Sequence, residues 1–252
     1  MLILFFFANT KRLQMNIKAQ IPNLFTMLNL FCGCVALVMV SDYKFDFAFY
    51  FVSLGIFFDF FDGFFARKFN VAGPLGVQLD SLADMVTSGV VPGYLMFTLL
   101  KGFIIDLSFW GFYPFLGFVI TLGACYRLAK FNIDERQSDN FIGLPTPANC
   151  LFIMSIPFFL EVPSNGIIVG NNIKIALIVI SFLSAYIMNA EIPLFSLKFK
   201  NFSFAKYKLQ IFFLAISAAM LFFLQILAVP MIIILYVLLS VINNMVKKKV
   251  TI

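Results

Sequence analysis

The chain has 252 residues, of which 62% are hydrophobic and only 12% are charged, and its mean hydropathy is +0.99. Soluble domains carry roughly 25% charged residues, so this composition excludes a soluble globular protein and indicates an integral membrane protein. The chain has no histidine, which excludes histidine as general base, metal ligand or haem ligand and leaves carboxylates, amines and hydroxyls for any chemistry.

Residues 1–20 are predicted to form a cytosolic segment before the first membrane span. They read MLILFFFANTKRLQMNIKAQ, with the basic residues after the apolar run. A cleaved signal peptide has its basic residues before the apolar run. No cleaved signal is therefore expected, and Met15 is an alternative start of the protein.

The cysteines lie in apolar stretches and lack the spacing of metal ligands. They are Cys32, Cys34, Cys125 and Cys150. Cysteines of this kind behave as small hydrophobic residues. We therefore expect them to be buried, and we expect no disulfide framework.

Apolar runs of about 20 residues, the length that a spanning helix needs, follow one another along the chain. About eight spans are predicted, at 21–40, 48–66, 79–100, 109–127, 148–164, 173–190, 210–227 and 229–246. The last two belong to one apolar run that is interrupted at Pro230, where we expect a tight hairpin because proline breaks a helix. The predicted fold is therefore a single all-α domain over 1–252, a polytopic membrane bundle of about eight transmembrane helices.

The basic residues give this bundle an orientation. With the N-terminus in the cytosol, only Lys44, Lys101 and Lys174 of the 18 lysines and arginines fall on the outer side. Lysine and arginine are enriched in cytoplasmic loops, so both termini are predicted to be cytosolic. The net charge of +6 then reflects topology and attraction to anionic headgroups, and no nucleic-acid partner is expected.

The most polar part of the predicted bundle is 59–84, which reads DFFDGFFARKFNVAGPLGVQLDSLAD. Asp59 and Asp62 share one stripe of the second span, and Asp80 and Asp84 share one stripe of the third. The topology puts both pairs at the cytosolic end of one helical hairpin. Because each aspartate near hydrocarbon costs roughly 2.5–3.5 kcal/mol, something must offset these charges.

Divalent cations are the simplest way to stabilise such a group of acids. Carboxylates repel one another by about 4 kcal/mol per pair at 4 Å and an effective dielectric near 20, and hard oxygen ligands suit Mg²⁺ or Mn²⁺, two of which can share bridging carboxylates. Gly63, Gly73 and Gly76 would let a diphosphate or nucleotide approach the backbone, and Arg67 offers a guanidinium to phosphate. The alternative is a proton or metal-ion pathway, with glycines that only allow close helix packing.

The spacing of these residues resembles the signature of the CDP-alcohol phosphotransferase family. The chain has Asp59-x2-Asp62-Gly63-x2-Ala66-Arg67-x8-Gly76-x3-Asp80-x3-Asp84 and matches the signature at all eight positions. At roughly 5% usage per residue type, a chance match is on the order of 10⁻¹⁰ per window.

This resemblance implies a substrate class and a role for each matching residue. The family transfers a phosphatidyl or phosphoalcohol group from a CDP-linked lipid such as CDP-diacylglycerol to an alcohol, and CMP leaves. It implies two metal ions bound by Asp59, Asp62, Asp80 and Asp84. It also implies that Asp84 is the general base, that Gly63 and Arg67 contact the nucleotide donor, and that Ala66 and Gly76 line its pocket. A homodimer is usual in the family.

Three further segments resemble the bacterial phosphatidylserine synthase branch of that family: NLFTMLNLFCGCVAL at 23–37, YRLAKFN at 126–132 and FIGLPTPAN at 141–149. L-Serine is therefore the expected acceptor and phosphatidylserine the expected product. The reaction is expected at the cytosolic face of the cell inner membrane. Arg127 and Lys130 would hold its carboxylate, and Asn132 or a backbone carbonyl its amino group. Glycerol 3-phosphate or inositol phosphate as the acceptor, and an ion or metal transporter, remain the alternatives.

Overall fold

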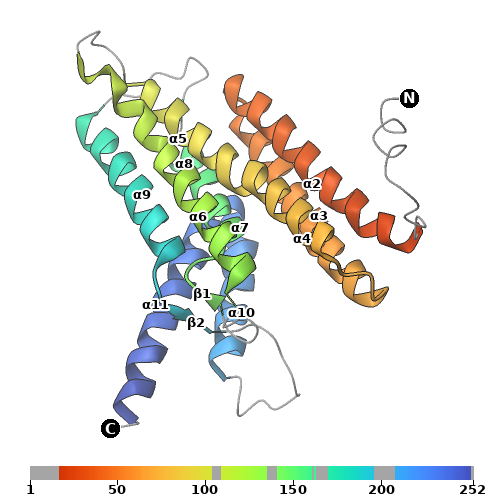
Figure 1. Cartoon of the computed structure of the whole chain (residues 1–252). Helices are drawn as coiled ribbons and strands as arrows, with labels where there is room; N and C mark the ends of the chain where they lie inside the picture. Colours follow the sequence, from red (N-terminus) through yellow and green to blue (C-terminus); the bar gives the residue numbers. More distant parts are fainter. Residues whose placement is uncertain are drawn as a thin grey trace, which may run out of the picture.

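The computed structural model describes residues 17–103, 109–134, 141–160, 162, 170–195 and 208–250, and this part of the chain is almost entirely helical (Figure 1). The α-helices are α2 (Ile17–Ser41), α3 (Phe45–Lys68), α4 (Pro74–Asp84), α5 (Val91–Lys101), α6 (Val119–Ile133), α7 (Thr146–Met154), α8 (Ile156–Leu160), α9 (Asn171–Asn189), α10 (Lys208–Leu224) and α11 (Ala228–Val250). The other helical turns are η1 (Met85–Val90), η2 (Phe109–Phe118) and η4 (Gln225–Leu227). The predicted all-α class is confirmed.

Six described segments are long and apolar enough to cross a membrane. They are Gln20–Ser41, Phe45–Lys68, Pro74–Lys101, Gly111–Ile133, Asn172–Asn189 and Lys208–Met245. The polytopic membrane fold is therefore confirmed, whereas the number of eight spans stays a prediction. Two differences account for the lower number: the predicted span 148–164 corresponds to the shorter apolar segment Thr146–Leu160, and the last two predicted spans fall in a single 38-residue segment.

The last apolar segment is broken close to the predicted position. The break is the 3₁₀ turn η4, where Gln225 has a left-handed backbone with φ of 49°. Pro230 lies in the first turn of α11, where the missing N–H of proline has no partner to lose. The chain therefore turns a few residues before the proline. Phe213 of α10 and Tyr236 of α11 pack with a 5.5 Å separation of their ring centroids, so the two helices contact each other.

The span Pro74–Lys101 runs through the middle of the bundle as three connected pieces, α4, η1 and α5. Pro74 starts α4 at a position where proline is well tolerated. The π-helical turn η1 follows directly after Asp84, and its backbone N–H bond from Val91 to the Val86 oxygen spans five residues. Pro92 comes next, and proline displaces the carbonyl four residues before it. The π turn therefore lets one continuous span hold both the aspartates and a proline.

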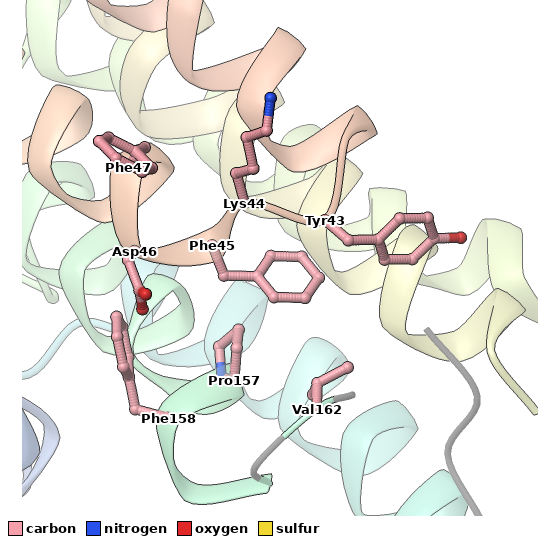
Figure 2. A pocket seen from close by; sticks show the side chains of 8 residues that line it. All are labelled: Tyr43, Lys44, Phe45, Asp46, Phe47, Pro157, Phe158 and Val162. Atoms are coloured by element: carbon pink, nitrogen blue, oxygen red, sulfur yellow. The ribbon is translucent and has the colours of Figure 1, made fainter. Parts of the chain in front are cut away.

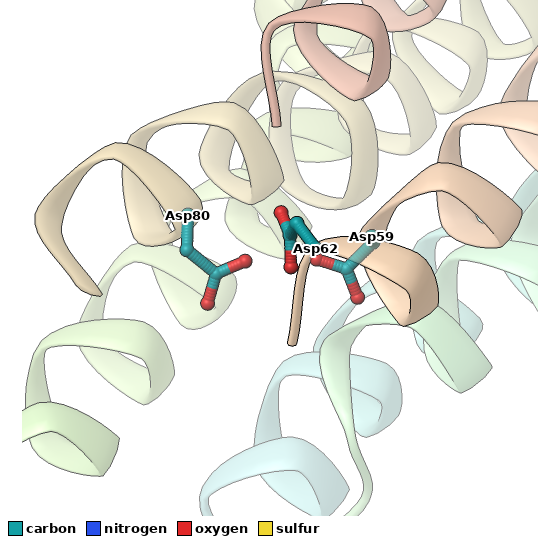
Figure 3. A group of neighbouring side chains, drawn as sticks. All are labelled: Asp59, Asp62 and Asp80. Carbon is teal, nitrogen blue, oxygen red and sulfur yellow. The ribbon is translucent and has the colours of Figure 1, made fainter. Parts of the chain in front are cut away.

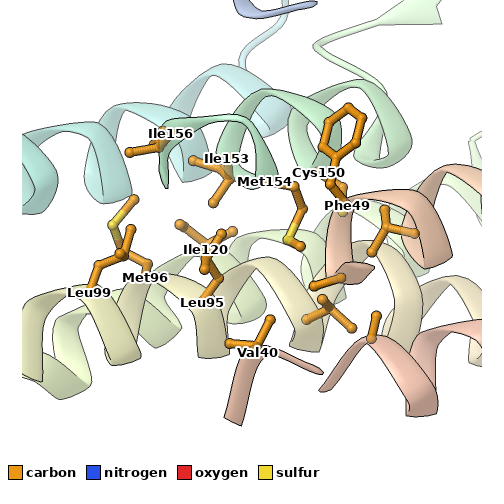
Figure 4. Packing of buried hydrophobic residues seen from close by; sticks show 14 of the residues in the cluster. Val40, Phe49, Leu95, Met96, Leu99, Ile120, Cys150, Ile153, Met154 and Ile156 are labelled. Carbon is orange, nitrogen blue, oxygen red and sulfur yellow. The ribbon is translucent and has the colours of Figure 1, made fainter. Parts of the chain in front are cut away.

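The hydrophobic core surrounds α5. Leu95, Met96 and Leu99 of α5 are fully buried against Ile120 of α6 and Ile153 of α7 (Figure 4). In the most apolar window of each span, 67% of the residues of Pro74–Lys101 are buried but only 11% of Lys208–Met245. The third span is therefore the centre of the bundle, and α10 and α11 lie at its edge. Figure 1 shows α2 and α3 side by side at one flank and α6 beside α9 at the other.

The cysteines are free in the structure, as predicted, but only two of them are buried. Cys32 and Cys150 lie inside the bundle, whereas Cys34 and Cys125 are exposed on its surface. The prediction of burial was wrong for the latter two because apolar composition does not tell a core-facing stripe from a lipid-facing stripe in a membrane helix.

The short ladder between β1 (Phe141–Ile142) and β2 (Pro193–Leu194) ties the start of α7 to the end of α9. The two strands pair antiparallel. Gly143 follows with φ of 77°, and a Cβ there would lie 2.4 Å from the Met188 carbonyl oxygen. The backbone N–H of Leu144 donates to the Ile187 oxygen at 3.1 Å. This turn therefore requires glycine and fixes the entry of α7 into the bundle.

A cavity of about 460 Å³ opens at the turn between α2 and α3 (Figure 2). It is lined by Tyr43, Lys44, Phe45, Asp46, Phe47, Pro157, Phe158 and Val162. Lys44 is paired there with Asp42, at 3.2 Å from Nζ to Oδ2. Asp59 lies 14 residues after Phe45, the first residue of α3, and this separation corresponds to about 21 Å of helix. The cavity is therefore at the opposite end of α3 from the aspartates.

Of the remaining predictions on organisation, the single domain over 1–252 and the homodimer stay predictions. Most of the predicted cytosolic segment 1–20 lies outside the described residues, and 17–20 belong to the first turn of α2.

Candidate active site

Three of the predicted acids come together between α3 and α4. Asp59 and Asp62 of α3 and Asp80 of α4 point toward one another, and each offers a carboxylate oxygen within 4.8 Å of the other two (Figure 3). Asp62 is buried, and Asp59 and Asp80 are half-buried. Hard oxygen donors at this separation, close enough to repel strongly when ionised, are the donor set of a divalent cation. The residues present therefore fit a metal site.

Asp84 lies one turn beyond Asp80 and is not part of this group of three. It is buried, and its Oδ1 accepts a hydrogen bond of 3.1 Å from Asn29 Nδ2. The side chain between the two acids, Ser81, is bonded to Asn132 of α6: Asn132 Nδ2 donates to Ser81 Oγ at 2.9 Å. The second acidic stripe therefore exists as predicted, but its two carboxylates have different surroundings.

Helix α2 provides a partner for each half of the site, which sequence reasoning missed. Thr26 Oγ1 donates to Asp62 Oδ2 at 2.6 Å, and Asn29 contacts Asp84 as described. Asn23, one turn before Thr26, has its Oδ1 4.0 Å from where a Cβ on Gly76 would lie. The three residues are spaced by three along one helix face. That spacing of polar residues inside an apolar span was the signal that could have found them.

The position of α2 is fixed by close helix contacts at two glycines, Gly33 of α2 and Gly55 of α3. A Cβ on Gly33 would lie 2.4 Å from Thr87 Oγ1, and one on Gly55 would lie 2.9 Å from Asn29 Oδ1. Thr87 Oγ1 in turn donates to the Asn29 backbone oxygen at 3.1 Å. Glycine at 33 and 55 therefore lets α2, α3 and η1 meet directly beside Asp84.

The predicted donor-binding residues lie on the same two helices as the grouped acids: Gly63, Ala66 and Arg67 on α3, Gly73 at the N-cap of α4, and Gly76 in α4. Arg67 is exposed and folds over Gly63, because a Cβ on Gly63 would lie 3.4 Å from one guanidinium nitrogen. Gly73 and Gly76 have open space beside them, with a single described atom at 4.0 Å from each added Cβ. Ala66 is half-buried one turn along α3 from Gly63. Gly73 and Gly76 are therefore loosely packed, and the role of each residue stays a prediction.

The predicted acceptor residues lie on α6, and they differ from one another. Arg127 is buried, with its guanidinium carbon 5.6 Å from the ring centroid of Phe131. Lys130 is directed toward Glu191, at 3.7 Å from Nζ to Oε1. Asn132 is bound to Ser81 of α4. Arg127 is therefore the predicted cation inside the bundle, and Lys130 has an acid beside it.

The segment GLPTPAN enters the bundle next to the same site. Cys150, just after this segment, donates from Sγ to the Thr87 backbone oxygen at 3.4 Å. Asn149 is fully buried, and its Oδ1 accepts a hydrogen bond from Ser184 of α9. Helix α7 therefore packs on the turn that follows Asp84, so that α2, α3, α4, α6 and α7 all contribute to one end of the bundle.

A bundle of apolar helices with a group of carboxylates on two adjacent spans that could hold a metal ion fits a membrane-embedded enzyme site. The family model of the CDP-alcohol phosphatidyltransferases matches residues 19–187, more than half of the chain. The chain belongs to this family.

Individual relatives carry more specific names. The chain is 36% identical over 144 residues to a CDP-diacylglycerol–serine O-phosphatidyltransferase of Bacillus subtilis (strain 168), which covers 55% of this chain and 76% of that protein. It is 29% identical over 212 residues to the enzyme of the same name from Helicobacter pylori (strain 26695), with 81% of each chain covered. An archaetidylserine synthase of Methanothermobacter thermautotrophicus is 31% identical over 139 residues, which are 54% of this chain and 56% of that protein.

Proposed function

We propose that this protein transfers the phosphatidyl group of CDP-diacylglycerol to L-serine, giving phosphatidylserine and CMP. The observation that carries the proposal is the meeting of Asp59, Asp62 and Asp80, with Asp84 one turn away, in a chain of the CDP-alcohol phosphatidyltransferase family. The names of the relatives from Bacillus subtilis and Helicobacter pylori support serine as the acceptor.

The four aspartates would hold two divalent ions, Mg²⁺ or Mn²⁺. Support comes from the carboxylate oxygens of the three grouped aspartates, which lie within 4.8 Å of one another. When bound, the ions supply neutralisation of the negative charge on the diphosphate and on the departing CMP. The same donor set in an ion pathway would be expected near the middle of the membrane, whereas Asp59 and Asp62 lie in the second half of α3, toward its predicted cytosolic end.

The residues around the acids bind the donor. Arg67 presents its guanidinium to the phosphates, since a planar fork of N–H donors matches phosphate oxygens. Gly63, Gly73 and Gly76, together with Ala66, keep side chains out of the space that the nucleotide takes. Support comes from the open space next to Gly73 and Gly76.

Asp84 takes the proton of the serine hydroxyl as its oxygen attacks the phosphorus that carries the diacylglycerol. The bond from serine oxygen to this phosphorus forms, the bond from phosphorus to the CMP oxygen breaks, and CMP departs with the electron pair. A buried carboxylate held by one hydrogen bond is suited to this task because its orientation is set before the substrate arrives.

Arg127 is the residue that we assign to the serine carboxylate, with Lys130 nearer the rim. Its burial favours one well-placed anion and not a phosphate dianion, which would call for more cations. We expect purified protein with CDP-diacylglycerol and Mn²⁺ to release CMP with L-serine and much less with glycerol 3-phosphate or inositol phosphate. Removing a hydrogen bond to a charged group costs about 1.5–3 kcal/mol, so Arg127→Ala should raise the KM for serine by about 10–150-fold and leave that for CDP-diacylglycerol nearly unchanged.

These measurements separate the assignments. A preference for glycerol 3-phosphate in a side-by-side assay would contradict serine and leave the transfer chemistry in place. The control for removal of a cation is Lys174→Ala. Lys174 lies at the start of α9 and contacts the Tyr113 ring. An equal rise of both KM values in Arg127→Ala would show a general loss of packing and not a serine contact.

The protein is proposed to lie in the inner membrane with its active site facing the cytosol, because loops rich in lysine and arginine stay on the cytosolic side. In a protein with Cys34 and Cys125 replaced by alanine, Ala72→Cys tests the loop at the aspartate end and Asp42→Cys tests the opposite end. Both positions are exposed. An impermeant maleimide applied to intact cells is expected to label the residue-42 variant and to reach residue 72 only after permeabilisation. The reverse pattern would invert the orientation.

A further inference from the structure

We propose that Thr26 and Asn29 of α2 are positioning residues with separate tasks: Thr26 orients the metal-binding carboxylate of Asp62, and Asn29 orients the carboxylate of Asp84 for proton transfer. The proposal rests on the proposed function, which makes Asp84 the base. It concerns residues outside the aspartate signature, on a helix to which the signature gives no role.

The contacts are specific to one carboxylate each. Thr26 Oγ1 reaches Asp62 Oδ2 at 2.6 Å, and Asn29 Nδ2 reaches Asp84 Oδ1 at 3.1 Å. Both α2 side chains are buried, at 2% and 0% exposed. Asp62 belongs to the group of three acids and Asp84 does not. One turn of α2 therefore separates a contact on the metal group from a contact on the fourth aspartate.

The Asn29 amide is held in one place. Its Nδ2 must face Asp84, because the opposite orientation would put a carbonyl oxygen against a carboxylate. Its Oδ1 faces Gly55, where an added Cβ would lie 2.9 Å away. The backbone of Asn29 is also fixed, since its oxygen accepts the hydrogen bond from Thr87. With Oδ1 of Asp84 held in this way, Oδ2 is the oxygen assigned to the serine hydroxyl.

Thr26 has a different arrangement. Its hydroxyl is also 3.2 Å from the Pro22 backbone oxygen, four residues before it on α2. A short hydrogen bond to an ionised carboxylate is strong, and partners of this kind set the orientation and the basicity of a metal ligand. The contact therefore acts on cation affinity and has no direct link to the proton acceptor.

The test compares three variants in the full-length protein. Asn29→Ala and Thr26→Val each remove one contact. Thr98→Val is a matched control, because Thr98 of α5 also donates to the carbonyl four residues before it, Tyr94, at 2.8 Å, and is not bonded to any of the aspartates of the site. Two quantities are measured: kcat for CMP release at saturating Mn²⁺, and the Mn²⁺ concentration that gives half of the rise in Tm without any substrate.

Loss of a side chain that orients a reacting or ligating group typically changes activity or affinity by about 10–100-fold. Asn29→Ala is expected to lower kcat by that factor and to raise the Mn²⁺ concentration less than Thr26→Val does, because Asp84 lies outside the group of three acids. Thr26→Val is expected to raise the Mn²⁺ concentration by that factor and to keep kcat at saturation. Thr98→Val is expected to change neither quantity. Asn29→Ser, whose hydroxyl is too short to reach Asp84, repeats the test in case the alanine variant does not fold.

Wild-type kcat in a folded Asn29 variant would overturn its role, and so would a rise in the Mn²⁺ concentration equal to that of Thr26→Val. An unchanged Mn²⁺ concentration in Thr26→Val would overturn the role of Thr26. Failure of the proposed function gives a different result, namely no serine-dependent CMP release by the wild type. The variants are then compared with glycerol 3-phosphate as acceptor, and the Mn²⁺ titration of Tm needs no acceptor.

Discussion

Asp84→Asn is expected to fold, to bind Mn²⁺ at the group of Asp59, Asp62 and Asp80 and to lose turnover by about 10²–10⁴-fold, the usual contribution of a positioned general base. The amide has nearly the shape of the carboxylate, so the buried contact with Asn29 is replaced by one of similar size. It cannot accept the hydroxyl proton of serine. The measurement is CMP release from CDP-diacylglycerol with serine, made on protein whose Tm is within the wild-type range.

The control for this substitution is Asp42→Asn, at the other end of the bundle. Asp42 is exposed and paired with Lys44, and exposed ion pairs contribute at most about 1 kcal/mol. The control protein should therefore keep wild-type turnover. Substantial turnover in folded Asp84→Asn would refute the assignment of the base and would leave the aspartates as metal ligands only.

Removal of divalent cations is expected to have an effect of similar size. Treatment with a chelator should abolish CMP release, and Mg²⁺ or Mn²⁺ should restore it, because the grouped carboxylates of Asp59, Asp62 and Asp80 would otherwise repel one another. The protein should also gain thermal stability as Mn²⁺ is added without substrate, because a ligand that binds only the folded state stabilises it.

A single aspartate variant refines this expectation. The attraction between one carboxylate and a cation charge at 4 Å, with an effective dielectric near 20, corresponds to about 4 kcal/mol. Even a third of that energy raises the cation concentration for half activity by about tenfold. Asp62→Asn should show at least this shift. Ser53→Ala, nine residues earlier on α3 and bonded to the Phe49 backbone, should show none. Titrations that coincide for Asp62→Asn and the wild type would exclude Asp62 as a ligand.

The central part of the site followed from residue spacing alone. Asp59 and Asp62 are three apart and Asp80 and Asp84 four apart, so each pair had to lie on one helix face. The glycine and proline at 73–74 had to separate two helices. What spacing could not give was the difference between Asp80, which joins the group of three, and Asp84, which faces Asn29, because that depends on how α2 packs across both helices.

Spacing also could not show contacts between segments that are distant in the chain. Glu191, which lies after α9, is beside Lys130 in the structure, and the assignment of Lys130 to the substrate stays a prediction. The predicted span 148–164 was based on apolar composition, and it corresponds in the structure to the shorter apolar segment Thr146–Leu160, whose helix is interrupted at Ser155. Apolar composition shows that a segment lies in lipid or in the protein core, but it does not show how far the segment extends across the bilayer.

The π-helical turn after Asp84 changes which residues can share a face of the third span. In an uninterrupted α-helix, Leu95 lies eleven residues after Asp84 and would point within about 20° of the same direction. One extra residue in the turn rotates everything after it by about 100°. The acidic half and the apolar half of one span can thus be oriented independently. An insertion or deletion of a single residue within 85–90 would rotate α5 relative to α4 by about 100° and turn Leu95, Met96 and Leu99 away from the core in which they are buried.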